Sequence, residues 1–166
     1  MGMNAYAALT YNGTALAGDV TITTIGSVDV SADHMELYQV KWGTRVGTEG
    51  QSHRASSHRR IQPIQIMKRI DGTTPELYQA LTQNATVAGD IKIFDTNPED
   101  GATRHRFTLT ISGARILAVE SCSPDAFDAD VSNRPPYEVV ELVPHTITYT
   151  DVVNSKEYTD EWSTAI

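Results

Sequence analysis

Residues 59–95, RRIQPIQIMKRIDGTTPELYQALTQNATVAGDIKIFD, decide the predicted fold because they hold the strongest helix signal of the chain between two strand-like runs. Thr73 and Glu76 have the spacing of a capping box, and Pro75 falls in the first turn, where its missing N–H costs no hydrogen bond. We therefore expect a helix over about residues 73–84. A helix of about three turns is too short to be stable alone in water, so tertiary packing must hold it.

The apolar side chains of this helix lie on one face. The i, i+3, i+4, i+7 pattern is formed by Leu77, Ala80, Leu81 and Asn84, and Tyr78 widens it. A stripe of this width covers one face of a sheet. We expect the helix to lie as a lid on a β structure and not inside a helical bundle.

Alternation of apolar and polar residues predicts strands in the rest of the chain. The expected strands cover residues 5–11, 20–25, 35–46, 64–70, 91–93, 107–111, 114–119, 137–143, 145–153 and 158–162, and loops are expected at 47–58 and 123–136. Ser112 and Gly113 are expected to kink the strand that contains them. The prediction is a mainly β fold, a small β-barrel of two antiparallel sheets with one short α-helix, in a single domain over residues 1–166.

Charge and cysteine content restrict the function classes. The 166 residues carry a formal net charge of −8, which argues against a nucleic-acid-binding protein, because such proteins usually present a basic face. Cys122 is the single cysteine, so the chain forms no internal disulfide and a cytoplasmic origin is the simple interpretation. The first residues lack the features of a signal peptide, and no apolar run is long enough to cross a bilayer, so we expect neither general secretory export nor membrane insertion.

The sequence does not have the pattern of a catalytic, cofactor or metal site. The motifs GxSxG, GxxxxGK and GxGxxG do not occur. His53 and His58 lack a metal-binding spacing, and the acidic segment with Asp125, Asp128 and Asp130 lacks the glycine and terminal glutamate of an EF-hand loop. We predict no enzymatic activity, no cofactor and no metal.

Two basic segments are candidates for contacts with other molecules. Arg104, His105 and Arg106 are interpreted as a solvated strand face or a protected edge. Residues 45–60 gather cations and histidines, whereas acidic residues dominate the chain from Glu120 onward. The basic segment is either a solvated loop or a protruding element that docks on an acidic surface of a second copy. The candidate contact residues are His53, Arg54, His58, Arg59 and Arg60.

The order of the segments resembles the hemolysin-coregulated protein (Hcp) family. The segments that carry the resemblance are AYAALTYNG, LAGDV, IQIMKRIDGTTPELYQALTQN, GDIKIFDT, RFTLTISGARILAVES and TITYTDVVNSKEYTDEWSTAI. IMKRIDGTTPELY is similar to the family's segment leading into its helix. The family's closing pattern is similar to Thr148, Tyr149, Asp151, Asp160 and Trp162. The chain departs from the family in the long loop GTEGQSHRASSHRR and in SVDVSADH, and both departures affect the expected details of ring stacking.

The resemblance implies a structural role. Family members fold as a small β-barrel with one helix, form hexameric rings, and stack into the secreted inner tube of a type VI secretion system, with effectors carried in the lumen. It implies contacts with sheath, spike and effector proteins, and a path from the bacterial cytoplasm to the exterior or into target cells. The alternatives are a tail-tube protein of a phage or another contractile injection particle, a monomeric β-barrel binding module, and an enzyme with an unrecognised site.

Overall fold

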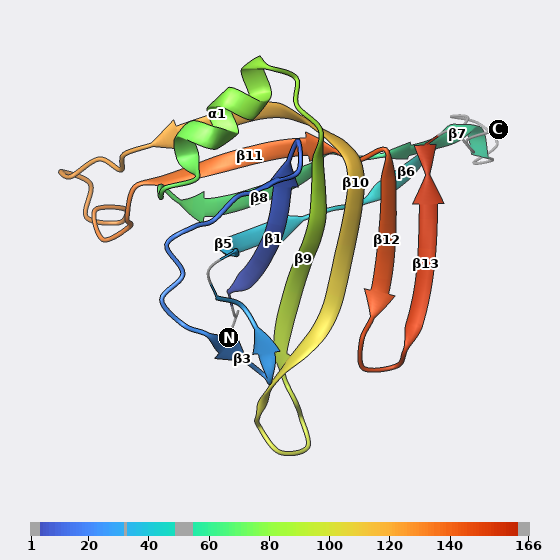
Figure 1. Ribbon diagram of the computed structural model, residues 1–166, viewed down its shortest axis with the longest axis horizontal. Helices are drawn as coiled ribbons and strands as arrows, with labels where there is room; N and C mark the ends of the chain where they lie inside the picture. Colours follow the sequence, from blue (N-terminus) through green and yellow to red (C-terminus); the bar gives the residue numbers. More distant parts are fainter. Residues whose placement is uncertain (1–3, 32, 49–54, 163–166) are drawn as a thin grey trace.

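The computed structural model describes residues 4–31, 33–48 and 55–162, and this part of the chain is mainly antiparallel strand with one helix (Figure 1). No described helix is long and apolar enough to span a membrane. The elements are β1 (Ala5–Tyr11), β2 (Thr14–Ala15), β3 (Thr24–Ile25), β4 (Val28–Asp29), β5 (Met35–Lys41), β6 (Thr44–Thr48), β7 (Ala55–Ile61), β8 (Ile64–Arg69), α1 (Thr74–Thr82), β9 (Val87–Thr96), β10 (Thr103–Cys122), β11 (Tyr137–Val143), β12 (Thr146–Asp151) and β13 (Lys156–Glu161).

The long strand β10 closes the main sheet on itself. Antiparallel neighbours follow the order β11-β8-β5-β1-β9-β10, and the second half of β10 returns to pair with β11. The first half of β10 also pairs with β12, which carries β13 on its other side. One strand of 20 residues serves three neighbours because it bends: its register shifts between Ile111 and Ala114, where Gly113 has φ 59°. The expected kink at Ser112 and Gly113 is confirmed, as is the mainly β fold with one short helix.

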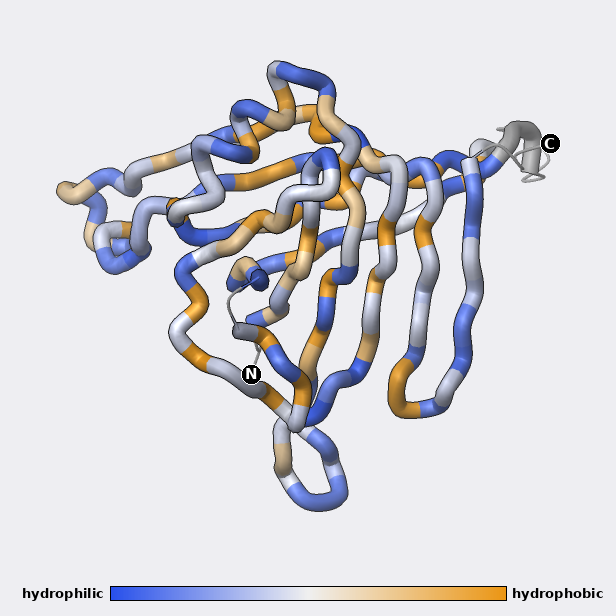
Figure 2. The backbone as a smooth tube through the Cα atoms, viewed as in Figure 1, coloured by the Kyte–Doolittle hydropathy of each residue, from blue (hydrophilic) through white to orange (hydrophobic). Residues whose placement is uncertain are grey.

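The main core fills the inside of the closed sheet. Along β8, Ile64 and Ile66 are buried inside and Gln65 between them is only partly buried. Figure 2 shows a similar alternation of hydrophobic and hydrophilic residues along the longer strands. The helix α1 lies across one end of the sheet with Leu77 and Ala80 buried (Figure 1). The expected role of the helix as a lid on a β structure is therefore confirmed.

A second, smaller apolar cluster lies where the segment containing β3 and β4 packs against β1 and β9. It consists of Tyr6, Val30 and Phe94, with the Tyr6 and Phe94 rings edge to face at 5.9 Å. Lys92 fixes this segment, because its Nζ lies 2.9 Å from His34 Nε2 and donates to the carbonyl of Asp29. Of the strand expected at 20–25, only β3 (Thr24–Ile25) forms, because the segment packs as a loop over an existing sheet.

Three details of the prediction are corrected by the structure. The helix covers 74–82 with Thr73 at its N-cap position, but the Thr73 side chain makes no capping hydrogen bond; its hydroxyl donates instead to Asp71 Oδ1 at 2.6 Å. The strand expected at 35–46 is interrupted after Lys41 and resumes at Thr44, where the chain leaves the main sheet for a hairpin. Within the loop expected at 47–58, the chain from Ala55 onward is strand β7, paired with β6, and residues 49–54 lie outside the described part.

Candidate functional site

The predicted basic segment forms the β6–β7 hairpin, which extends from the main sheet beside the end of β13 (Figure 1). The structure places Arg59 and Arg60 on β7. His58 also belongs to β7, whereas His53 and Arg54 lie outside the described residues. The structure therefore places Arg59 and Arg60 next to each other on one projecting strand.

Arg59 joins the hairpin to the C-terminal strand. Its Nε lies 2.9 Å from Asp160 Oδ1 and its Nη2 also donates to the carbonyl of Glu161 at 3.1 Å. Asp160 is 5% exposed, and its hydrogen bond to the guanidinium raises the pKa of Arg59. A carboxylate this well covered holds its arginine in one geometry. The role of Arg59 within the monomer is therefore to position the hairpin.

Arg45 and Arg60 present unbalanced positive charge on the hairpin. They are directly opposite each other on β6 and β7, and both are exposed. Neither has an ion-pair partner among the described residues. Like charges at opposite positions destabilise a strand pair. An anionic surface from outside the monomer would offset this repulsion.

The acidic segment at 123–136 forms a structured loop between β10 and β11. Asp125 Oδ1 accepts from the backbone N–H of Phe127 at 2.9 Å, and Asp128 Oδ1 accepts from that of Asp130 at 2.9 Å. These carboxylates shape turns. No group of three potential ligand residues suitable for a metal occurs in the described chain. Phe127 is 99% exposed at this loop.

The basic hairpin and the acidic loop lie at opposite ends of the molecule. In Figure 1 the loop before β11 projects at the left and the β6–β7 hairpin at the right. The pairing of β8 with β11 supports this arrangement. Tyr137, which follows the acidic loop, pairs with Arg69 at the end of β8, whereas the hairpin precedes the start of β8, where Ile64 pairs with Leu142. The monomer therefore carries charge of opposite sign at its two ends.

The basic strand segment of β10 is satisfied within the chain. Arg104 donates to Asp95 at 2.8 Å and lowers the pKa of that carboxyl. Arg106 pairs with Asp151 at 2.8 Å. His105 contacts Thr108 at 2.8 Å. These contacts fit the interpretation of a solvated strand face and leave this segment without a free cation for phosphate.

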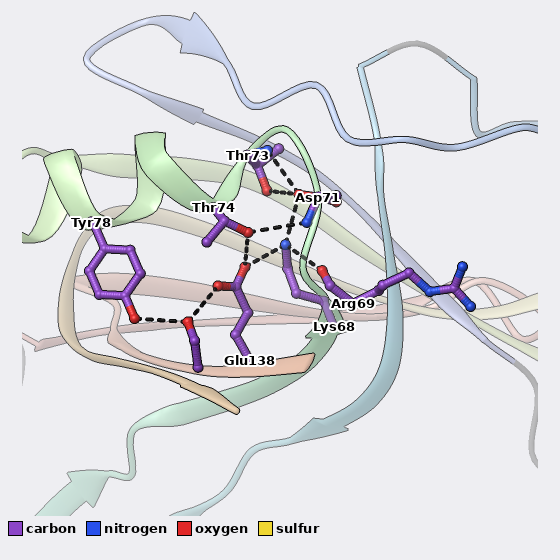
Figure 3. A network of polar contacts seen from close by, with 8 residues as sticks. Lys68, Arg69, Asp71, Thr73, Thr74, Tyr78 and Glu138 are labelled. Carbon is purple, nitrogen blue, oxygen red and sulfur yellow. Dashed lines mark hydrogen bonds and ion pairs between the residues drawn. The ribbon is translucent and has the colours of Figure 1, made fainter. Parts of the chain in front are cut away.

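A buried ionic network ties the start of α1 to the sheet, as Figure 3 shows. Lys68 Nζ lies 2.5 Å from Glu138 Oε1 and 2.8 Å from Asp71 Oδ1, and the Lys68 and Glu138 side chains are fully buried. Thr74, the first residue of α1, donates to Glu138 at 2.9 Å. Asp71 accepts from the Thr73 N–H at 2.8 Å. No substrate reaches fully buried groups, so the network orients the helix.

Sequence reasoning did not predict this network. The inner face continues from Ile64 and Ile66 to Lys68, while Ile70 is 38% exposed. The sequence signal for the network is that residues two apart on a strand share a face: Lys68 shares a face with Ile66, and Glu138 shares one with the apolar Val140. Two opposite charges on inner faces of strands predict a buried pair.

Cys122 ends β10 and is exposed. A hydrogen bond with the thiol raises the pKa of Tyr137 on the neighbouring strand.

The chain is similar to known secretion proteins. Residues 10–150 match the family described as type VI secretion system effector, Hcp. The solved structure of an Hcp protein superposes with a TM-score of 0.82 at 18% identity, covering 96% of this chain and 97% of that chain. A variant of Hcp1 from E. coli EAEC 042 superposes with a TM-score of 0.79 at 20% identity, covering 98% of this chain and 99% of that chain. The secreted protein Hcp3 from Pseudomonas aeruginosa superposes with a TM-score of 0.70 at 20% identity, covering 95% of this chain and 99% of that chain.

Among curated proteins, none matches the chain by sequence. The solved Hcp structures share its fold over nearly the whole length of both chains, and the family match spans the helix, the network around Lys68 and most of the strands. Hcp proteins are structural components of a secretion tube and not a family of enzymes. The chain belongs to the Hcp family of type VI secretion system proteins.

Proposed function

We propose that this protein forms hexameric rings that stack head to tail into the inner tube of a type VI secretion system and carry effectors in the lumen. Membership of the Hcp family is the observation that carries this proposal. Sheath, spike and effector proteins are its partners, and the protein passes from the bacterial cytoplasm to the exterior or into target cells. It works without a cofactor, nucleic acid or membrane insertion.

The charge distribution of the monomer supports head-to-tail assembly. Opposite charges at opposite ends favour a heterologous contact, in which one surface of a copy meets a different surface of the next. The exposed pair of Arg45 and Arg60 is the cationic side of this contact. The acidic loop at 123–136 is the anionic side. Exposed charges attract over about 8 Å at physiological salt, so stacking through them weakens as salt is raised.

The test separates ring formation from stacking. Solution mass and electron microscopy of the purified protein are expected to show six-fold particles and tubes. Replacing Arg45 and Arg60 with glutamate is expected to leave the rings intact and to shorten the tubes. Arg59 is left unchanged, because reversing it would break the bridge to Asp160 and disturb the hairpin itself. Lys156→Glu, an exposed charge reversal on β13, is the matched control.

The outcomes distinguish the competing functions. Unchanged tube length in the double arginine variant would overturn the charge contact while leaving the tube protein in place. A single-chain mass at high concentration would overturn the tube and support a monomeric binding module. Rings with the dimensions of a phage tail tube would place the protein in the other class of contractile particles.

A further inference from the structure

Phe127 is an aromatic side chain presented to solvent by a fixed turn. It is 99% exposed, whereas large apolar side chains elsewhere in the described chain are at least partly covered. The carboxylate of Asp125 accepts from its N–H at 2.9 Å, and the carbonyl of Asp128 accepts from the N–H of Ser132 at 2.8 Å, so the loop has a defined shape. The result is an apolar knob bordered by carboxylates.

A groove at the other end of the molecule has the complementary chemistry. It has a volume of about 370 Å³ and is lined in part by Trp42, Pro63, Lys41 and Arg45. Trp42 is 39% exposed and lies on Phe107, with ring centroids 5.9 Å apart and planes 16° from parallel. This stack gives the groove a rigid aromatic wall. The two cations stand where β5 ends and β6 begins.

We infer that Phe127 of one copy inserts into the groove beside Trp42 of the next copy, with Asp125 and Asp128 facing Lys41 and Arg45. This inference rests on the proposed function and names the contact that would join successive copies. Burial of the aromatic ring supplies the apolar part of the contact and the flanking charges fix its orientation. The pairing also gives Arg45 an anionic partner, which it lacks among the described residues of its own chain.

The positions of knob and groove make the contact directional. The knob precedes Tyr137, which pairs with Arg69, whereas Lys41 pairs with Gln65 near the opposite end of β8. Two different surfaces at opposite ends give a heterologous contact that extends from copy to copy and closes into a ring or continues as a filament.

A second groove lies at the same end as the knob. It has a volume of about 670 Å³ and is lined in part by Tyr38, Met67, Arg69, Tyr137 and Val139. A knob and groove at one end pair across a two-fold axis and close with two copies. Such a pair cannot extend into a tube. The groove beside Trp42 is therefore the assigned partner, and the second groove provides the competing outcome of the test.

Disulfide trapping between copies tests the assignment. Ala126→Cys beside the knob is combined with Gln62→Cys in the groove, in a Cys122→Ser background that removes the natural thiol. Oxidation at assembling concentration is expected to give a ladder of three or more linked chains on non-reducing gels. The matched variant pairs Ala126→Cys with Val139→Cys in the second groove, and it is expected to give no linkage between these two positions. Covalent dimers from that variant, with no ladder from the first, would overturn the inference.

A knob variant separates this contact from the proposed function. Phe127→Ser is expected to raise the concentration needed for half assembly at least tenfold, a factor equivalent to about 1.4 kcal/mol, while Ala126→Ser leaves it unchanged. Both residues are exposed, so the monomer fold is not affected. Assembly of the unaltered protein together with unchanged assembly of Phe127→Ser would overturn the inference alone. Failure of the unaltered protein to assemble would overturn the proposed function.

Discussion

Replacing Lys68 with methionine is expected to destabilise the fold strongly although it removes no apolar contact. Methionine fills a similar volume without the charge, so the packing around β8 is kept. The variant leaves Glu138 and Asp71 without the ammonium that lies 2.5 Å and 2.8 Å from them. Because the start of α1 is anchored on these carboxylates through Thr74 and Thr73, the helix loses its attachment as well.

The magnitude follows from the burial of the network. Removing one partner of a buried ion pair costs about 3–5 kcal/mol because the other charge stays uncompensated. Thr74 and Ser121 still donate to Glu138, which places the loss near the lower end, at about 3 kcal/mol. Against a usual free energy of unfolding of about 5–15 kcal/mol this is a large fraction. At roughly 2–4 °C per kcal/mol for a domain of this size, Tm falls by about 6–12 °C.

Urea unfolding followed by tryptophan fluorescence measures the loss, with all variants at one protein concentration so that assembly contributes equally. Lys156→Met is the control, since that lysine is exposed and its replacement is expected to change stability by less than about 0.5 kcal/mol. The double variant Lys68→Met with Glu138→Leu is expected to be more stable than the sum of the single changes predicts. A loss below about 1 kcal/mol for Lys68→Met would refute the argument that the buried charges depend on each other.

Gly89→Ala is expected to destabilise the protein by about 3 kcal/mol or more, because φ at Gly89 is 142° and an added Cβ would clash with the Ala8 carbonyl oxygen. Gly43→Ala is the control, since a Cβ at Gly43 would meet no atom within 4 Å. Equal urea midpoints for the two variants would contradict the clash. Burial and the Lys92 ammonium lower the pKa of His34 from 6.5, so the unfolded chain takes up its proton first. The contribution of neutral His34 to the free energy of unfolding is fully present above pH 6.5 and is lost as the pH drops toward the lower pKa of the folded state. Urea midpoints at about pH 7.5 and pH 5.5 measure this loss, and His34→Gln is expected to show a smaller drop between the two pH values.

The elements that the sequence located correctly are those with a local cause. The strand at Ala5–Tyr11 has its predicted bounds, since a mostly apolar run ends at the Asn12-Gly13 turn. The helix was found because Pro75 and the Leu77 stripe act within three turns. Thr73 stands at the predicted N-cap, but its hydroxyl bonds to Asp71, which Lys68 holds in place, and its side chain makes no capping hydrogen bond.

The candidate contact residues show where sequence reasoning stops. Charge content located the basic segment, and Arg60 is exposed on a projecting hairpin as a contact element requires. No local pattern indicates that Arg59 is engaged by Asp160, which is 101 residues away in the chain. Phe127 also went unnoticed, because an aromatic residue in a polar loop is recognisable as a knob only when its exposure is known.

By itself the sequence determined the β-rich composition of the fold, its short helix and the uneven distribution of charge, because each depends on residues within a few positions of one another. Tertiary structure decided how β10 closes the sheet, which charges are neutralised within the chain, and that the acidic loop and the basic hairpin stand at opposite ends. Lys68 and Glu138 are 70 residues apart, and no local pattern fixes the register that brings them together. Strand pairing over such separations depends on the whole core packing at once.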